Sequence, residues 1–187
     1  GRADLDTDAV DVAAAVAAAV RDVTTEAADR GITFHGRLAP CEAVTNLPLL
    51  RQAVGNLLAN AVRHNAGGGT VEVETGTDPR PGWVRVRIRN TGPVIDPQVV
   101  QLLGEPFYRI RPRYRPAGRG HSHGLGLPIA LAITEALGGS LALTANSEGG
   151  LTAELRLPAV DAGKLAVPSE AAPGKPGTNR RYGRLQD

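Results

Sequence analysis

TVEVET at residues 70–75 and WVRVRIRN at residues 83–90 are the two stretches of this sequence that decide its fold. In both, apolar and polar side chains alternate with a period of two, which is the pattern of a β-strand with one buried face. The intervening DPRPG is rich in turn-forming residues. We therefore predict two neighbouring strands of a sheet that turns one face toward a core.

The segments around this strand pair predict helices and further strands. Ala and Val at helical spacing indicate a helix over residues 8–30, with Gly31 as its C-terminal cap. A second apolar stripe indicates a helix over residues 48–64. The remaining predicted elements are strands over 32–38, 140–145 and 151–158, a short helix around 97–103 and a helix over 125–137.

The order of these elements predicts an α+β fold, a two-layer sandwich in which a mixed, mostly antiparallel sheet is covered on one face by about three helices. The other face is either exposed or packed against a partner. The 187 residues, 42% of them hydrophobic, suffice for one compact domain, which we place at residues 1–158. Residues 159–187 lack an apolar period, so we expect a mostly disordered tail there.

Composition argues against several classes of function. Cys41 is the single cysteine, so an internal disulfide is excluded and a reducing compartment is expected. The net charge of +2 gives no general field for nucleic acid. No stretch approaches the roughly 20 apolar residues of a membrane span, and the acidic start GRADLDTD does not resemble a signal peptide. We expect a soluble fragment that is not inserted in a membrane.

The helix over residues 48–64 is too polar on one side for a purely structural role. Amide oxygens are hard, neutral ligands suited to Mg²⁺, and basic side chains one turn further along could meet phosphates. The alternative is a solvated helix flank, which is the ordinary setting of a single exposed Asn. The polar residues that share this face are Gln52, Asn56, Asn60, Arg63 and His64.

Two further segments predict contacts with a ligand. Asn90 ends a strand with Gly92 behind it, so an amide oxygen could accept a bond from an exocyclic amine while glycine lets the backbone approach a flat ring. The alternative is an ordinary Asn-Thr-Gly turn. Residues 124–127, with the sequence GLGL, open a helix, whose free N–H groups and dipole favour phosphate, although a short glycine motif is weak evidence alone.

The stretch EPFYRIRPRYRPAGRGHSH, residues 105–123, lies between these segments and is rich in arginine. Its arginines could fold over a polyphosphate, which predicts a lid; the alternative is a solvated basic loop. His121 and His123 lack a nearby carboxylate or cysteine, so they make a poor zinc site.

Taken together and in this order, the segments resemble the ATP-binding domain of sensor histidine kinases, within the group that includes the Hsp90, type II topoisomerase and MutL ATPases (the Bergerat fold). LLRQAVGNLLANAVRHN is similar to the N box of that family, NTGPV to its G1 box, EPFYR to its F box and HGLGLPIA to its G2 box. The resemblance covers residues 47–158, and GGLTAELRLP is similar to the last strand of the family.

The resemblance implies ATP and Mg²⁺ as cofactors and a role for each matching residue. Asn60 is the implied Mg²⁺ ligand, Asn56 a polar catalytic helper and Arg109 the arginine near the terminal phosphate. Asn90 matches the aspartate that reads the adenine amine. The other implied nucleotide-binding residues are Arg63, His64, Gly92, Val94, Gly124, Leu125, Gly126, Leu127 and Thr152.

The sequence departs from the family at two positions of the G1 box and in its histidines. Asn90 replaces an acid and Val94 replaces a glycine, so adenine binding could be weaker or less selective. None of the histidines lies in the His-acid context of the family's phosphoacceptor, which sits on a dimerisation hairpin. We therefore expect the chain to bind nucleotide without autophosphorylating.

The resemblance also implies partners and leaves alternatives. The implied partners are the dimerisation hairpin of a homodimeric, membrane-anchored parent kinase, with this domain on the cytoplasmic side, and a response regulator. The alternatives are another ATPase or serine kinase of the same fold, or a non-catalytic nucleotide-sensing or docking module with a degenerate G1 box.

Overall fold

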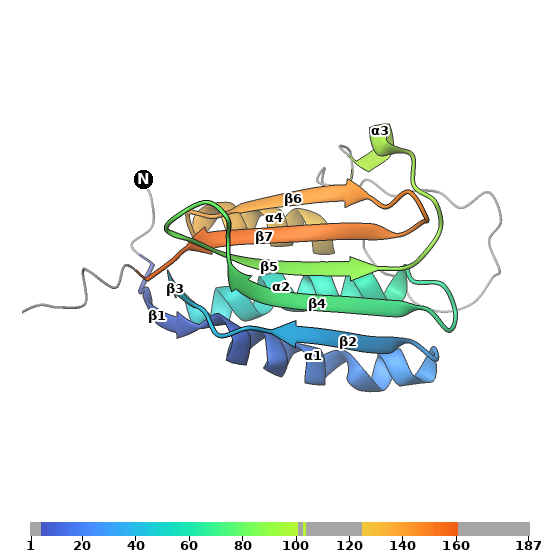
Figure 1. The fold of residues 1–187 in the computed structure, drawn as a ribbon, viewed down its shortest axis with the longest axis horizontal. Coiled ribbons are helices and arrows are strands. Elements are labelled where there is room, and N and C mark those ends of the chain that lie inside the picture. The colour runs from blue at the N-terminus through green and yellow to red at the C-terminus, as the bar shows by residue number, and fades with distance from the viewer. Residues whose placement is uncertain (1–4, 101–102, 104–124, 161–187) are drawn as a thin grey trace, which may run out of the picture.

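The computed structural model describes residues 5–100, 103 and 125–160 of the chain. The predicted helices and strands are present with ends within a few residues of those expected, apart from the N-terminal region (Figure 1). The elements are β1 (Asp8–Asp11), α1 (Val12–Asp29), β2 (Thr33–Leu38), β3 (Glu42–Thr45), α2 (Leu47–Arg63), β4 (Thr70–Thr77), β5 (Trp83–Asn90), α3 (Pro97–Val100), α4 (Gly126–Ala136), β6 (Ser140–Ala145) and β7 (Leu151–Pro158).

Five strands form the main sheet, in the order β2-β4-β5-β7-β6. β2 runs parallel to β4, and the other neighbouring strands are antiparallel, which confirms the mixed, mostly antiparallel sheet. The last strand in sequence, β7, therefore lies between β5 and β6 (Figure 1). In this register Asn90 at the end of β5 is opposite Val71 of β4 and Leu151 of β7.

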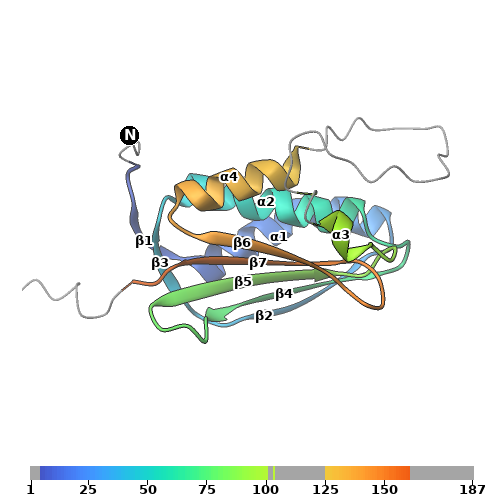
Figure 2. The ribbon, with the colours of Figure 1, turned by 90° about the horizontal axis from the view of Figure 1, so that it is seen from above.

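Helices α1, α2 and α4 lie on one face of this sheet, with α2 in the middle (Figure 2). β5 sends Val84, Val86 and Ile88 toward them, and each of these side chains is at most 2% exposed. Burying an aliphatic side chain contributes about 1.5–3 kcal/mol, so each of these three side chains stabilises the contact between sheet and helices. The predicted two-layer α+β sandwich with one helix-covered face is confirmed.

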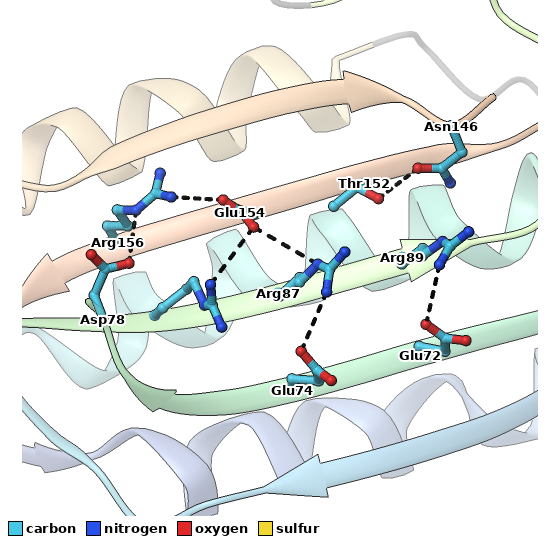
Figure 3. Close-up of polar contacts among 10 residues, drawn as sticks. Glu72, Glu74, Asp78, Arg87, Arg89, Asn146, Thr152, Glu154 and Arg156 are labelled. Atoms are coloured by element: carbon cyan, nitrogen blue, oxygen red, sulfur yellow. Dashed lines mark hydrogen bonds and ion pairs between the residues drawn. The ribbon is translucent and has the colours of Figure 1, made fainter. Parts of the chain in front are cut away.

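The opposite face of the sheet carries charged side chains that pair across the strands (Figure 3). Arg87 of β5 lies 3.6 Å from Glu74 and 3.8 Å from Glu154. At the far end of the sheet, Arg156 Nε lies 2.9 Å from Asp78 Oδ2. Partly exposed ion pairs such as those of Arg87 contribute only about 0–1 kcal/mol each, so this face adds less stability than the helix-covered one.

The N-terminal helix begins later than the sequence analysis predicted. Residues 8–11 form β1, which pairs antiparallel with β3, and β3 was not predicted at all. Asp11 ends the strand and caps α1, because its Oδ1 accepts a hydrogen bond from Ala14 N at 2.9 Å. A capping aspartate favours a helix start at this point, and the buried Val10 is held by pairing with Ala43 instead.

The described part of the domain continues slightly past residue 158. Ala159 N donates to the Gly82 carbonyl, and Val160 N donates to the Glu42 carbonyl at 3.1 Å. The rest of the predicted tail, residues 161–187, lies outside the described residues. Among the helices that the structure describes, none has the length and apolar character needed to cross a bilayer.

Candidate functional site

The C-terminal end of β5 places the Asn90 side chain inside the molecule. The alternation along β5 puts it on the helix-covered face, where the residue is 4% exposed. Its Nδ2 donates to the carbonyl of Thr91 at 2.7 Å. This bond fixes the amide plane and leaves Oδ1 to accept from another group. A buried amide oriented in this way can read an N–H group of a ligand.

A hydrogen-bond network ties the end of α2 to the ends of β4 and β5. The hydroxyl of Thr91 donates to Asn65 Oδ1 at 2.6 Å and accepts from Thr70 N at 2.8 Å. Asn65 Nδ2 in turn donates to the Thr70 carbonyl at 2.9 Å. Because Asn65 directly follows the cap of α2, this network sets the position of that helix relative to Asn90.

Glycines let three backbone segments meet around Asn90. A Cβ on Gly92 would lie 2.8 Å from the His64 carbonyl, and a Cβ on Gly150 would overlap the Asn90 carbonyl. Gly150 also has a φ of 85°, a region that favours glycine. Gly92 thus permits a close backbone approach, although here the neighbour is the end of α2. Its approach to a flat ring stays a prediction.

Asn56 and Asn60 lie one turn apart on α2, and both are partly buried. Asn56 Nδ2 is buried without a hydrogen-bond partner among the described residues. An unpaired buried donor costs about 1–3 kcal/mol, so such an atom is a candidate to bond a ligand or a water molecule. The start of α4 lies close to Asn56, since a Cβ on Gly126 would lie 3.8 Å from the Asn56 carbonyl.

Helix α4 therefore begins beside the part of α2 that carries Asn56. Its N-cap residue, Leu125, makes no side-chain capping bond, and Leu127 in the first turn is buried. The N-terminal N–H groups of a helix carry a partial positive charge that favours anions. Gly124, the first residue of the predicted motif, lies outside the described residues.

Two predicted residues, Arg63 and His64, lie where α2 ends. Arg63 Nε is 3.3 Å from Glu26 Oε1 of α1. Since α2 lies between α1 and α4, this side chain turns toward α1, away from the start of α4. His64 is the exposed C-cap of α2, and its carbonyl packs against Gly92. The structure thus brings the His64 backbone to the site, and it does not bring the Arg63 guanidinium there.

The structure does not bring the predicted residues Thr152 and Val94 together with the Asn90 side chain, and it does not describe Arg109. Thr152 of β7 is opposite Arg89 in the register and lies with it on the charged face, so it is not brought to Asn90 (Figure 3). The β7 residue that shares the face of Asn90 is Leu151. Val94 is 75% exposed. Arg109 lies outside the described residues.

Sequence reasoning missed Asn146 and the network of Asn65 with Thr91. Asn146 lies in the β6–β7 turn, and its Nδ2 donates to the Asn90 carbonyl at 3.1 Å across 56 positions in sequence. The only signal available in the sequence was the turn-forming character of NSEGG, which predicts a turn and does not reveal its distant partner.

A magnesium ion at this site would depend on neutral ligands. Within the ranges that the structure describes, no group of three or more His, Cys, Asp or Glu side chains could hold a metal ion. His121 and His123, which the sequence analysis judged a poor zinc site, lie outside those ranges. Asn60 offers an amide oxygen, and Mg²⁺ commonly completes its octahedron with water and phosphate oxygens. The residues present therefore fit a phosphate-bound Mg²⁺.

The chain matches a known family over the part that forms this site. A family model described as histidine kinase-, DNA gyrase B- and HSP90-like ATPase covers residues 45–161. This range contains the asparagines of α2, the end of β5 and the start of α4.

Two curated relatives are sensor proteins. Sensor protein CutS of Streptomyces coelicolor is 36% identical over 150 residues, which are 80% of this chain and 35% of that protein. Sensor histidine kinase CusS of Escherichia coli is 33% identical over 123 residues, which are 66% of this chain and 25% of that protein. The chain thus spans about a third or less of the length of these relatives.

Solved structures of histidine kinases share the fold. The mycobacterial sensor histidine kinase MprB has a TM-score of 0.70 at 26% identity, over 82% of this chain and 98% of that one. Full-length ShkA in complex with AMPPNP has a TM-score of 0.71 at 21% identity, over 87% of this chain and 33% of that one. The second likeness concerns the fold alone.

Proposed function

The chain belongs to the family of histidine kinase-, DNA gyrase B- and HSP90-like ATPases, and from this premise we propose that it binds Mg²⁺-ATP as the catalytic domain of a sensor histidine kinase. In this role it supplies the γ-phosphoryl group to a histidine on a dimerisation hairpin of a longer, homodimeric parent, and a response regulator receives the group. The parent is anchored in the cell membrane with this domain on the cytoplasmic side.

The orientation of Asn90 supports recognition of adenine. Its Nδ2 is engaged by the Thr91 carbonyl at 2.7 Å, so the amide offers Oδ1 as an acceptor. Adenine carries an exocyclic amine, which donates, whereas guanine carries a carbonyl at the same position, which would repel that oxygen. A neutral amide gives a weaker hydrogen bond than a carboxylate, so we expect ATP to be preferred but held less tightly than by an aspartate.

The facing parts of α2 and α4 support a phosphate site. Asn56 Nδ2 is a buried donor without a protein partner among the described residues, and the start of α4 lies beside it at Gly126. We assign the phosphates to these donors and to the N-terminal amides of α4, with Leu125 and Leu127 shaping the turn. Arg109 is proposed to approach the terminal phosphate from the segment that the structure does not describe.

Asn60 is proposed to hold Mg²⁺ through its side-chain oxygen. When bound, the ion neutralises phosphate charge, which is the main electrostatic demand of phosphoryl transfer. The chain itself orients the nucleotide, since Asn90 fixes the base while Asn56 donates to the phosphates. Positioning of this kind accounts for most of the rate in phosphoryl transfer, because the protein has little covalent chemistry to perform.

The observation that carries this proposal is the network of Asn65 and Thr91, which holds the buried Asn90 amide at a fixed place beside the end of the helix that bears Asn60. Calorimetric titration with Mg²⁺-ATP tests it. We expect measurable binding that depends on Mg²⁺. Asn90→Ala should weaken ATP binding by about tenfold, the equivalent of one well-placed hydrogen bond, and Asn60→Ala should remove the Mg²⁺ dependence.

Gln52→Ala is the matched control, because Gln52 is an exposed residue on the polar face of the same helix, one turn before Asn56, and is not among the residues proposed to bind nucleotide. Its titration should equal that of the unmodified chain. Circular dichroism of every variant separates loss of binding from loss of fold. A folded chain that binds no nucleotide at millimolar concentration would contradict the proposal and favour a docking module with a degenerate G1 box, for which Asn90 and Val94 are the supporting departures.

Phosphoryl transfer needs a second test, since another ATPase or a serine kinase of this family would also bind ATP. The chain is mixed with the histidine hairpin of its parent and with ATP labelled in the γ position. We expect an acid-labile phosphohistidine on the hairpin and no labelling of the chain alone. Label that survives acid, as phosphoserine does, would support the serine kinase instead.

A further inference from the structure

The β6–β7 turn reaches Asn90 through a relay of two side chains. Asn146 Nδ2 donates to the Asn90 carbonyl at 3.1 Å, and the Thr152 hydroxyl donates to Asn146 Oδ1 at 2.7 Å. Figure 3 shows Thr152 and Asn146 pointing toward each other on the charged side of β7. The backbone of Asn146 closes the turn, because its N–H donates to the Gly150 carbonyl at 3.1 Å.

We propose that Asn146 is a positioning residue for Asn90, that Thr152 orients Asn146, and that the pair sets how strongly the site prefers a purine with an exocyclic amine. This inference rests on the proposed function, because it takes Asn90 as the residue that reads the base. It gives Thr152 a role that does not require contact with nucleotide.

The relay has a direction that follows from the chemistry of the amide. An asparagine has a donor end and an acceptor end, and the Thr152 hydroxyl occupies the acceptor end of Asn146. The donor end is therefore turned toward the Asn90 carbonyl. Thr152 is 7% exposed and Asn90 is 4% exposed, so water competes poorly with these bonds.

The position of the Asn90 carbonyl affects the side chain of the same residue. Gly150 packs so closely that a Cβ on it would overlap this carbonyl, and Gly150 N donates to the Pro93 carbonyl at 2.8 Å. On its other side the loop is fixed by Thr91 and Asn65. If Asn146 turned away, the buried carbonyl would lose this bond and the backbone could shift. Hydrogen-bond strength falls steeply with misalignment, so the contact of Asn90 Oδ1 with the base would weaken first.

The test compares two nucleotides on variants of Thr152. Mg²⁺-ATP carries the exocyclic amine, whereas the Mg²⁺ complex of purine riboside triphosphate lacks it and is otherwise the same. Thr152→Val removes the hydroxyl and keeps the shape, so we expect a two- to tenfold loss of ATP affinity, as for one neutral hydrogen bond, and less than a twofold change for the purine analogue. Thr152→Ser retains the hydroxyl and should restore the preference for ATP.

Two further variants complete the design. Thr144→Val is the matched control. Thr144 is the exposed β6 neighbour of Thr152, so this variant tests the same substitution on the same face of the sheet. It should leave both affinities unchanged. Asn146→Ala removes the donor to the Asn90 carbonyl directly, so it should lower ATP affinity as Thr152→Val does. It also tests the inference if the buried valine of Thr152→Val disturbs folding.

Each contrary outcome identifies what has failed. Equal losses for ATP and the purine analogue in Thr152→Val and Asn146→Ala would indicate a general structural role and overturn the inference. An unchanged preference in both variants would also overturn it, while the proposed function would stand if Asn90→Ala abolishes the preference. If Asn90→Ala retains the preference, Asn90 does not read the base, and the inference fails together with that part of the proposed function.

Discussion

The eight residues of β5 alternate between two faces of the strand, and different interactions stabilise each face. Residues 84, 86 and 88 are aliphatic and buried under the helices, and this row ends in Asn90. Residues 85, 87 and 89 are arginines that pair with carboxylates of β4, β7 and the β6–β7 turn. The first row depends on close packing and fixed hydrogen bonds, whereas the second depends on charges in contact with water.

This difference indicates which face of β5 tolerates amino-acid substitutions. Packing is lost in full when a buried atom is removed, because neighbours relax only partly to fill the cavity. Exposed ion pairs lose little, because water and salt already screen them. Asn90 lies at the end of the buried row of β5, so the close packing of the core holds it in place. We therefore expect substitutions to differ sharply between the faces.

The largest effect is expected for Ile88→Ala on the packed face. Ile88 is 2% exposed in the core, so the truncation should lower the free energy of unfolding by about 3 kcal/mol. Urea denaturation followed by circular dichroism measures the loss. A change below about 1 kcal/mol would mean that this face repacks freely, and the contrast between the faces would then be wrong.

A somewhat smaller effect is expected for Gly150→Ala, beside the Asn90 carbonyl. The new Cβ would overlap this carbonyl and sit on a residue with a φ of 85°, so we expect a loss of about 2–3 kcal/mol together with weaker nucleotide binding. Gly138→Ala separates the two causes, because Gly138 has a φ of 75° with open space around it. It should cost about 1 kcal/mol and leave binding unchanged.

Asp78→Asn tests the ion pair at the far end of the charged face. A backbone N–H bond from Arg80, together with the guanidinium of Arg156, lowers the pKa of Asp78. This carboxylate therefore stabilises the fold above its ordinary pKa of about 4, and the contribution is lost as the pH falls toward the lower folded pKa. At pH 7 the free energy of unfolding of the variant should be about 0.5 kcal/mol lower than that of the unmodified chain. At pH 2 the two should be equal, and urea denaturation at both pH values measures the difference.

The smallest effect is expected for Arg87→Ala, which shares β5 with Ile88 but lies on the charged face. Its pairs with Glu74 and Glu154 are 3.6 and 3.8 Å long and partly exposed, so we expect at most about 0.3 kcal/mol, the low end of such pairs. The loss should shrink further in about 1 M salt, where the Debye length falls to about 3 Å. A salt-independent loss as large as that of Ile88→Ala would refute the contrast.

Periodicity alone predicted most of the fold. The alternation in TVEVET and WVRVRIRN predicted two strands with one buried face, and in the structure Asn90 continues the buried row of Val86 and Ile88. The four-residue strands β1 and β3 were not predicted. The Ala and Val in β1 also fit the helical pattern that follows, and β3 is too short to show a period. Strands of this length are defined by their pairing partner, which a single sequence does not reveal.

The site was predicted less completely, for reasons of geometry. Thr152 was predicted to bind the nucleotide, and this stays a prediction; the structure adds that Thr152 shares the face of Arg89, because a shift of one residue along a strand changes the face. Arg63 was predicted to meet phosphates from its helical spacing, which does not show that its guanidinium lies beside Glu26 of another helix; its contact with nucleotide stays a prediction. Asn146 was missed because its bond to Asn90 depends on how two turns meet in space.

The central place of β7 has a consequence for how the protein is made. The ribosome produces β7 last among the strands described, yet this strand joins β5 to β6 in the middle of the sheet. Nascent chains that end before residue 151 can form the β4–β5 hairpin but cannot yet hold β6 or enclose Asn90. Protection of Asn90 from proteolysis or hydrogen exchange should therefore appear abruptly, only once β7 has emerged from the exit tunnel.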